Sequence, residues 1–153
     1  MSYSVPRAVV EAFYEAYATR DIERSAQLID DDVVWTISGP VDLLAFCGVR
    51  RGKAEVLDMM RRQVEAVFHV HSVVTDVMLV EGDRAATFNR LSARTGDGRV
   101  VSYRLAHFMR FRDGKMVENV SLIDTFDAVE QVLGHPLAGQ SDERAEDDTF
   151  VSM

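Results

Sequence analysis

The spacing of hydrophobic residues divides the chain into a helical first half and a strand-rich second half. Apolar side chains recur at helical spacing over residues 5–19, which predicts an amphipathic helix. A shorter helix is predicted over residues 22–29, with Asp21 in the position of an N-terminal cap. Residues 53–67 predict a third helix, because their apolar side chains again gather on one face.

Strands are predicted where the period of the apolar residues changes to two. Residues 31–39 form a first strand, and residues 41–52 read as a loop. Residues 69–124 contain four more strands in an antiparallel meander. The turns between these four strands contain glycine and lie at residues 81–83, 95–98 and 113–114. Residues 125–134 predict a short last helix that ends at Gly134.

Helices followed by hairpins are typical of an α+β fold. We expect a cone in which three N-terminal helices pack on a strongly bent antiparallel sheet, with a short C-terminal helix. The open end between helices and sheet is the natural place for a small-molecule pocket. Residues 1–137 are predicted to form this single domain, and the polar, acidic residues 138–153 a mobile tail.

Charge and composition narrow the partners and the location. The formal net charge of −8 argues against nucleic acid and against an anionic membrane surface, because both attract basic proteins. Cys47 is the single cysteine, so no internal disulfide can form and a reducing compartment is expected. The first residues lack the pattern of a signal peptide, and no apolar run is long enough to span a membrane. These features predict a soluble cytoplasmic protein.

Asp124 is the first candidate for chemistry, because this carboxylate ends an apolar strand. It could cap the following helix by accepting from its first amides, with Asp127 near the positive helix end. Alternation along the strand instead groups Asp124 with Val120 and Leu122 on the more apolar side, which predicts that it faces the cavity. A partly desolvated carboxylate there would suit proton transfer near neutral pH. Both interpretations stay open.

His107 and the pair Asn89-Arg90 are further candidates. His107 lies on the apolar side of its predicted strand, either as a core residue or as an acid or base diagonal to Asp124. Counted outward from the turn, it should pair near Val120 or Leu122. Asn89 and Arg90 alternate, so only one of them can face inward, and periodicity does not decide which. An inward Arg90 would keep Asp124 ionised, whereas the alternative is a solvent-exposed arginine.

Aromatic and methionine side chains are candidate pocket walls, although each could equally be plain core. They are Phe13, Tyr17, Trp35, Met60 and Tyr103. Together they favour an apolar, cyclic small molecule. No metal or cofactor is predicted, because His69 and His71 have ligand spacing without a third ligand, and no nucleotide-binding motif is present. Cys47 lies in an apolar loop without a predictable base, which argues against a nucleophile.

The order of these elements resembles the nuclear-transport-factor-2-like superfamily, and within it the SnoaL-like polyketide cyclases, isomerases and hydrolases. The segments that carry the resemblance are "VVEAFYEAYATRDIERSAQLIDDDVVW", "GVRRGKAEVLDMM" and "HFMRFRDGKMVENVSLIDTFDAVEQVLG". They are good markers of the fold and poor markers of function, because the superfamily uses one fold for many reactions.

The resemblance carries over unevenly to individual residues. The positions that match the base, tyrosine and acid of ketosteroid isomerases hold Ile37, Phe13 and His107, so all three are replaced. The positions that match the Arg-x-Asp motif and terminal aspartate of limonene-epoxide hydrolases hold Arg90, Ser92 and Asp124. SnoaL-type cyclases use an aspartate with nearby histidines, and Asp124 with His107 is similar to that arrangement.

We therefore expect a cofactor-independent SnoaL-like enzyme that performs acid–base chemistry on an apolar small molecule. Asp124, His107 and Arg90 are its candidate catalytic residues, and Asn89 joins the pocket walls as a candidate substrate contact. A non-catalytic binding or dimerisation domain is the alternative. A homodimer through the outer face of the sheet is also expected, because Phe108 lies on that face. Arg104 and Arg110 flank it.

Overall fold

The computed structural model describes residues 2–137, so the predicted tail, residues 138–153, lies outside the described residues. In chain order the elements are α1 (Arg7–Ala18), α2 (Ile22–Gln27), β1 (Ile29–Ser38), β2 (Gly48–Arg51), α3 (Lys53–Asp58), a π-helical turn η1 (Met59–Gln63), α4 (Val64–Val67), β3 (His69–Glu81), β4 (Arg84–Arg94), β5 (Val100–Arg112), β6 (Lys115–Ile123) and α5 (Thr125–Leu133).

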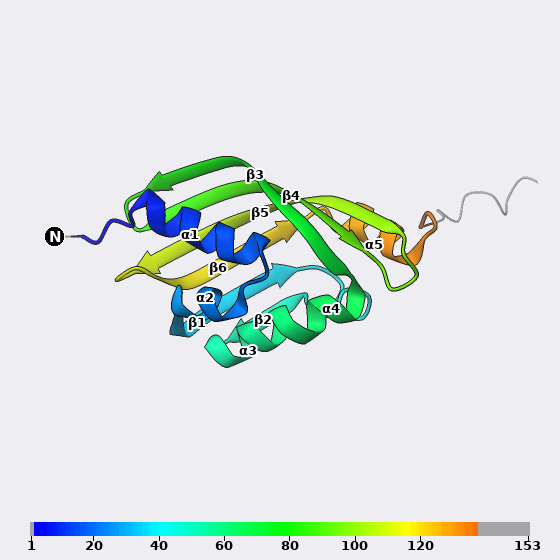
Figure 1. Ribbon diagram of the computed structural model, residues 1–153, viewed down its shortest axis with the longest axis horizontal. Coiled ribbons are helices and arrows are strands. Elements are labelled where there is room, and N and C mark those ends of the chain that lie inside the picture. The colour runs from blue at the N-terminus through cyan, green and yellow to red at the C-terminus, as the bar shows by residue number, and fades with distance from the viewer. Residues whose placement is uncertain (1, 138–153) are drawn as a thin grey trace, which may run out of the picture.

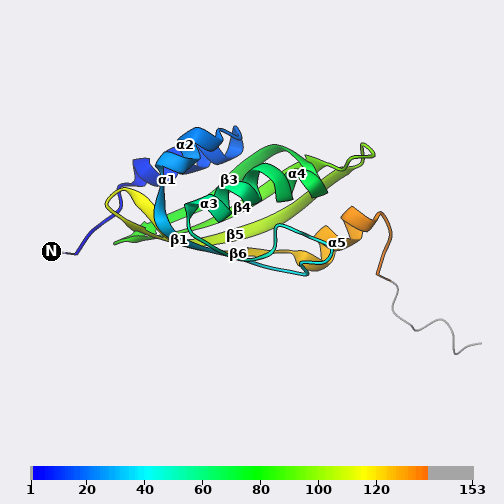
Figure 2. The same cartoon turned by 90° about the horizontal axis from the view of Figure 1, so that it is seen from below.

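The strands form one six-stranded sheet in the order β2-β1-β6-β5-β4-β3. β1 runs parallel to β6, and the other neighbouring strands are antiparallel. The four helices α1 to α4 lie over one face of the bent sheet, and α5 lies beyond its end (Figures 1 and 2). The edge strands β2 and β3 do not pair with each other, so the sheet stays open. The predicted α+β class and element order are confirmed.

The ends of the short helices follow the predicted local signals. The Asp21 carboxylate accepts from the Arg24 amide at 3.0 Å and caps α2. Gly134 ends α5 with a φ of 80°, a left-handed conformation that favours glycine. The segment read as a loop, residues 41–52, differs from the prediction, because it contains the short strand β2 against β1.

The third helix is not regular. Its middle turn, η1, is π-helical, so one extra residue is inserted and two consecutive methionines, Met59 and Met60, point into the core. The Arg20 guanidinium donates to the Met60 carbonyl, and it forms an ion pair with Glu65 at 3.1 Å. The π-helical turn is thereby held from outside by a residue that follows α1.

A β-bulge in β6 reverses the predicted facing of the second half of this strand. Arg110 of β5 pairs with Glu118, whereas the next residue, Phe111, pairs with Met116. Val117 is therefore an extra residue with no partner of its own on β5. Alternation counted from Met116 is correct only as far as the bulge.

Beyond the bulge, the odd-numbered residues of β6 face the helices. Asn119 and Ser121 are buried, whereas Leu122 is 48% exposed. Ser121, and not Val120 or Leu122, pairs with His107. The predicted inner side of β6 is therefore wrong from Glu118 onward, and Asp124 follows the outer side.

Candidate functional site

An interior cavity lies between the concave face of the sheet and the helices. Its residues come from α1, α4 and η1 and from strands β1, β4, β5 and β6, and they include Tyr17, Trp35, Met60, Tyr103, His107 and Ser121. The cavity is narrow, with a volume of about 30 Å³. This is room for one or two waters, so a larger ligand has to displace side chains.

Several predicted pocket residues are in place. Trp35, Tyr103, Tyr17, Met60 and His107 all line the cavity, as their strand or helix periodicity indicated. Phe13 is fully buried but lies behind the wall, where it packs against Tyr17 with ring centroids 5.9 Å apart. The prediction that Phe13 lines the pocket is not confirmed.

His107 is the polar centre of this cavity. Its side chain is only 1% exposed, and its Nδ1 lies 2.5 Å from the Tyr14 hydroxyl of α1. The same hydroxyl lies 2.5 Å from Oγ1 of Thr87 on β4. Tyr14 therefore joins the first helix to two strands of the sheet.

The hydrogen-bond chain continues on β4 and β3. Asn89 donates to Thr87 Oγ1 through Nδ2 at 3.0 Å, and its Oδ1 accepts from Thr75 at 2.8 Å. The Thr87 hydroxyl accepts from Asn89, and its own hydrogen can point to the Tyr14 oxygen. We assign Tyr14 as the donor to Nδ1 of His107, because the other group near its hydroxyl, the Met109 sulfur 3.8 Å away, is a weak acceptor.

The assigned direction implies one tautomer of His107. With Nδ1 accepting, the ring proton sits on Nε2, which makes Nε2 a donor on a residue that lines the cavity. Burial lowers the pKa of His107 to about 4, so the imidazole is neutral at neutral pH. The site thus offers a neutral N–H donor in an apolar surrounding.

Other cavity residues also carry polar hydrogens, among them Tyr17, Tyr103 and Trp35. Burial raises the pKa of Tyr17, and it raises that of Tyr103 well above the usual value, so both stay protonated. Trp35 is 1% exposed, and its Nε1 has no hydrogen-bond partner within residues 2–137. No aspartate or glutamate of the described residues lines this cavity.

The structure gives little support to a metal site or a reactive thiol. Within residues 2–137 there is no group of three His, Cys, Asp or Glu side chains placed to hold a metal ion. Burial raises the pKa of Cys47 to about 11, which keeps the thiol protonated. His69 contacts Glu65 on the surface instead.

The structure shows which of the neighbours Asn89 and Arg90 faces inward. Asn89 faces inward and is fully buried, but its side-chain amide is hydrogen-bonded to Thr75 and Thr87. Arg90 faces outward and forms two hydrogen bonds with Asp76, at 2.7 and 2.8 Å. A catalytic Arg90 would have to face inward, and the structure places it on the outer face instead.

Asp124 neither caps α5 nor faces the cavity. Its side chain makes no capping hydrogen bond to α5, although it is the residue before this helix. It lies instead in a shallow outer hollow beside Phe88 and Leu122, with Arg104 at 3.4 Å. The expected cavity position is wrong because the Val117 bulge shifts the alternation of β6 by one residue.

Tyr14 and Thr87 are the functional candidates that the sequence did not reveal. Tyr14 sits between Phe13 and Tyr17, and helical spacing could only place it on a mixed helix face. Thr87 lies two residues before Asn89 and on the same side of β4, so its place beside this candidate is the signal that the sequence offers. Their meeting depends on how α1 crosses the sheet.

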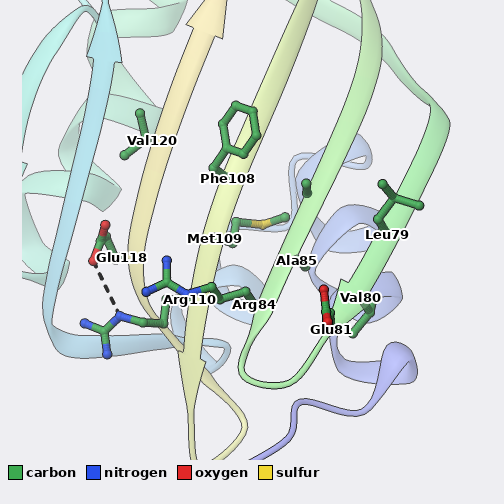
Figure 3. Close-up of a pocket in the computed structure, with 11 residues that line it drawn as sticks. Leu79, Val80, Glu81, Arg84, Ala85, Phe108, Met109, Arg110, Glu118 and Val120 are labelled. Atoms are coloured by element: carbon green, nitrogen blue, oxygen red, sulfur yellow. Dashed lines mark hydrogen bonds and ion pairs between the residues drawn. The ribbon is translucent and has the colours of Figure 1, made fainter.

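A wide hollow lies on the opposite face of the sheet. It offers about 580 Å³ and is formed by strands β3 to β6. Figure 3 shows Phe108 and Val120 side by side on this face, with the ion pair between Arg110 and Glu118 below them. This groove is larger than the cavity, but the buried polar chain of His107 lies on the other face, so we place the candidate site inside.

The sequence profile of the SnoaL-like domain matches residues 10–119, which is most of the described chain. The chain belongs to the SnoaL-like domain family. A proposed isomerase from Rhodopseudomonas palustris shares 35% sequence identity and a TM-score of 0.72, with 82% of this chain and 93% of that chain covered. No curated protein matches the sequence significantly.

More distant solved structures share the fold of this SnoaL-like domain. TerC, co-crystallised with polyporic acid, gives a TM-score of 0.75 at 21% identity, covering 82% of this chain and 96% of its own. An LEH-like epoxide hydrolase from M. tuberculosis gives 0.66 at 20% identity, covering 83% and 88%. The resemblance to the superfamily drawn from the sequence is confirmed. None of the helices among residues 2–137 is long and apolar enough to cross a membrane.

Proposed function

We propose that this SnoaL-like domain is a small enzyme that uses its own side chains for acid–base chemistry on an apolar molecule in the interior cavity. The supporting observation is the 2.5 Å contact between the Tyr14 hydroxyl and Nδ1 of the buried His107. With Tyr14 assigned as the donor, Nε2–H lies on a neutral ring that lines the cavity. The reaction would be of the isomerase, cyclase, dehydratase or hydrolase type. The proposed isomerase at 35% identity supports this class.

In this proposal His107 acts on an oxygen atom of the substrate. Burial raises the pKa of Tyr14 above its usual value, so the phenol keeps its proton and goes on donating to Nδ1. Nε2–H then donates to the reacting oxygen and stabilises the negative charge that develops there. A neutral imidazole suits this role, because it needs no proton from solvent before each reaction.

A non-catalytic binding domain is the second candidate, and one observation favours it. No carboxylate of the described residues lines the cavity, so the wall contains no evident strong base. Without a base to remove a proton from the bound molecule, the site would hold a ligand and not convert it. Asp124 and Arg90 have no part in either candidate, because both lie on the outer face.

The experiment combines a ligand screen with two substitutions of His107. Thermal shift identifies ligands, and turnover of each hit is then measured for wild type, His107→Asn and His107→Gln. Asparagine can accept from Tyr14 but has no N–H at the position of Nε2, whereas glutamine keeps an amide N–H there. We expect turnover to fall at least about 100-fold in His107→Asn and less in His107→Gln. Ligands that bind all three proteins without turnover would support the binding domain.

We also propose that two copies pair through the outer face of the sheet. Large apolar side chains are exposed together on strands β3 to β6: Val74, Val77, Leu79, Phe88, Phe108 and Leu122. Exposed apolar side chains that gather on one face often mark an interface, and a second copy of the same face would cover them.

A further inference from the structure

Two segments that are far apart in the sequence meet on the helix side of the cavity. Tyr17 and Arg20 come from the end of α1 and the turn after it, whereas Met60 and Val64 come from η1 and α4. Most lining residues are buried, and the partly exposed ones are Tyr17, Arg20, Val64 and Ile123. Three of these four belong to the two segments, so the cavity comes close to solvent between them. We call this place the entrance.

The helix wall is the part of the cavity that can move. A cavity of about 30 Å³ admits no organic ligand unless a wall shifts. The sheet wall is tied by the hydrogen-bond ladders between β1, β6, β5 and β4. The helix wall is less regular, because η1 is π-helical and no side chain of the described residues caps α3, η1 or α4. Single π-helical turns are frequent at functional sites, and the methionines of η1 are flexible.

One side of this helix wall is fixed to the edge of the sheet. Lys53 at the start of α3 pairs with Asp31 of β1 at 3.0 Å. Arg50 of β2 donates to Gln63 of η1 at 3.2 Å and also to backbone carbonyls of the loop before β2. Movement of η1 therefore has to begin on its other side, at the entrance.

Arg20 is the fastening on the entrance side. Its guanidinium donates to the Met60 carbonyl and pairs with Glu65 at 3.1 Å, and its side chain is 22% exposed. Within the described part of the chain, no other hydrogen bond or ion pair joins α1 or α2 to residues 53–67. One side chain thus holds the two segments together across the entrance.

The backbone of Arg20 has a conformation that glycine usually adopts. Arg20 follows the C-cap of α1 with a φ of 58°, and the amides of Arg20 and Asp21 bond back to the carbonyls of Tyr17 and Ala16. A side chain is unfavourable in this left-handed conformation. Glycine at this position would keep the turn and lose only the guanidinium, which makes the two effects separable.

We propose that η1 and α4 form a gate to the cavity and that Arg20 holds this gate closed. Release of the guanidinium from the Met60 carbonyl and from Glu65 frees the entrance side of η1, which moves away from Tyr17 while α3 stays on the sheet. The inference rests on the proposed function only in taking the interior cavity as the ligand site. It adds the route by which a ligand enters and a residue that controls this route.

The single tryptophan reports whether the gate is open. Trp35 lines the cavity and is 1% exposed, so acrylamide, a neutral quencher of indole fluorescence, reaches it when the cavity opens. Arg20→Gly removes the guanidinium and suits the left-handed backbone, so the fold is retained. The bimolecular quenching constant of Trp35 should rise about fivefold in this variant, because the charge-assisted contacts that oppose opening are lost.

Arg24→Ala is the matched control. Arg24 forms an ion pair with Glu15 at 3.2 Å on the surface and does not line the cavity, so its loss should leave the quenching constant at the wild-type value. An unchanged quenching constant in Arg20→Gly, or an equal rise in Arg24→Ala, would overturn the inference.

Hydrogen exchange separates opening of the gate from general loosening. In Arg20→Gly the amides of residues 60–65 should exchange about fivefold faster, whereas those of β5 and β6 should keep their wild-type rates. Faster exchange across the whole sheet would assign Arg20 to overall stability and would contradict the gate.

The end of β6 is the alternative entrance, because Ile123 is the remaining partly exposed lining residue. Val64→Phe and Ile123→Phe each place a larger side chain at one of the two openings. Both are combined with Arg20→Gly, in which quenching is fast enough to show a decrease. Val64→Phe should slow the quenching of Trp35 and Ile123→Phe should not. The reverse result would move the entrance to the end of β6 and overturn the inference.

These outcomes are independent of the chemistry in the cavity. Quenching needs no substrate, so a gate that opens in Arg20→Gly stands even if His107→Asn keeps full turnover. Turnover that depends on His107 together with an unchanged quenching constant in Arg20→Gly would support the enzyme and contradict the gate.

Discussion

The Tyr14 hydroxyl lies 2.5 Å from Nδ1 of His107, and this contact joins residues that are 93 positions apart in the sequence. With Tyr14 assigned as the donor, Nε2 of the buried imidazole carries the proton. The remaining links, through Thr87 to Asn89, lie on the sheet and hold the Tyr14 oxygen in place.

Tyr14→Phe is expected to destabilise the protein and to allow both tautomers of the His107 imidazole. The variant leaves Nδ1 and the Thr87 hydroxyl buried without this partner, so the free energy of unfolding should fall by about 1–3 kcal/mol. Urea unfolding measures this loss, and ¹⁵N spectra of the imidazole should show both tautomers instead of Nε2–H alone.

Tyr3→Phe is the matched control for this prediction. The Tyr3 hydroxyl accepts from the Gly114 amide at 2.7 Å, far from the cavity, so its loss also removes one tyrosine hydrogen bond. It should leave the His107 tautomer and any turnover at the wild-type level. A Tyr14→Phe protein with unchanged imidazole spectra would contradict the assigned role of Tyr14.

Acid should destabilise the folded protein through His107. Its pKa falls from 6.5 to about 4 on burial, so the unfolded chain takes up a proton at a higher pH than the folded one. Stability is therefore unaffected by this group above pH 6.5 and is lost as the pH falls toward 4, by about 3 kcal/mol in all. Urea unfolding of wild type and His107→Gln between pH 7 and 4 measures the difference, since the glutamine does not titrate. Parallel curves for the two proteins would show that His107 is not buried as described.

Asp124→Asn should leave turnover unchanged. The carboxylate lies on the outer face in a partly exposed pair with Arg104 at 3.4 Å, and such surface pairs contribute less than about 1 kcal/mol to stability. Turnover of any ligand found in the screen and urea unfolding are both measured for this variant. A large loss of turnover would show that Asp124 reaches the substrate in a conformation unlike the present one.

Phe108→Asp should separate the proposed dimer. Phe108 is 50% exposed at the centre of the outer face, and a charge there opposes burial against a second copy. Light scattering after size exclusion should find wild type at twice the chain mass and the variant at the chain mass. Phe126→Asp, at a 61% exposed phenylalanine of α5, is the control that should stay dimeric. A wild-type protein that is monomeric at micromolar concentration would contradict the proposal.

Regular alternation explains why much of the cavity wall could be predicted. On β5, buried and exposed residues alternate from Val101 to Arg112, so Tyr103 and His107 were correctly placed on the inner face. Trp35 followed from the same period on β1, and the capping signal at Asp21 was enough to start α2.

The errors have two physical causes. At Met116-Val117 both neighbours are apolar and both are buried, so nothing in the sequence marks the bulge except this pair itself. The chain from Tyr14 to His107 is a tertiary arrangement, because it depends on the crossing of α1 over the sheet. A short stretch of sequence reveals neither the bulge nor the helix crossing. The sequence therefore predicts an inward Asp124 and does not single out Tyr14.

The bulge at Val117 also affects how relatives can be compared. A homologue that lacks this one residue would turn the positions of Val120 and Leu122 toward the cavity and those of Asn119 and Ser121 toward the outer face. Aligned letters on β6 would then describe opposite walls of the molecule. Loss or gain of a single codon here could exchange a binding surface for an assembly surface, and residue-by-residue transfer of catalytic roles along this strand is meaningful only between proteins that share the bulge.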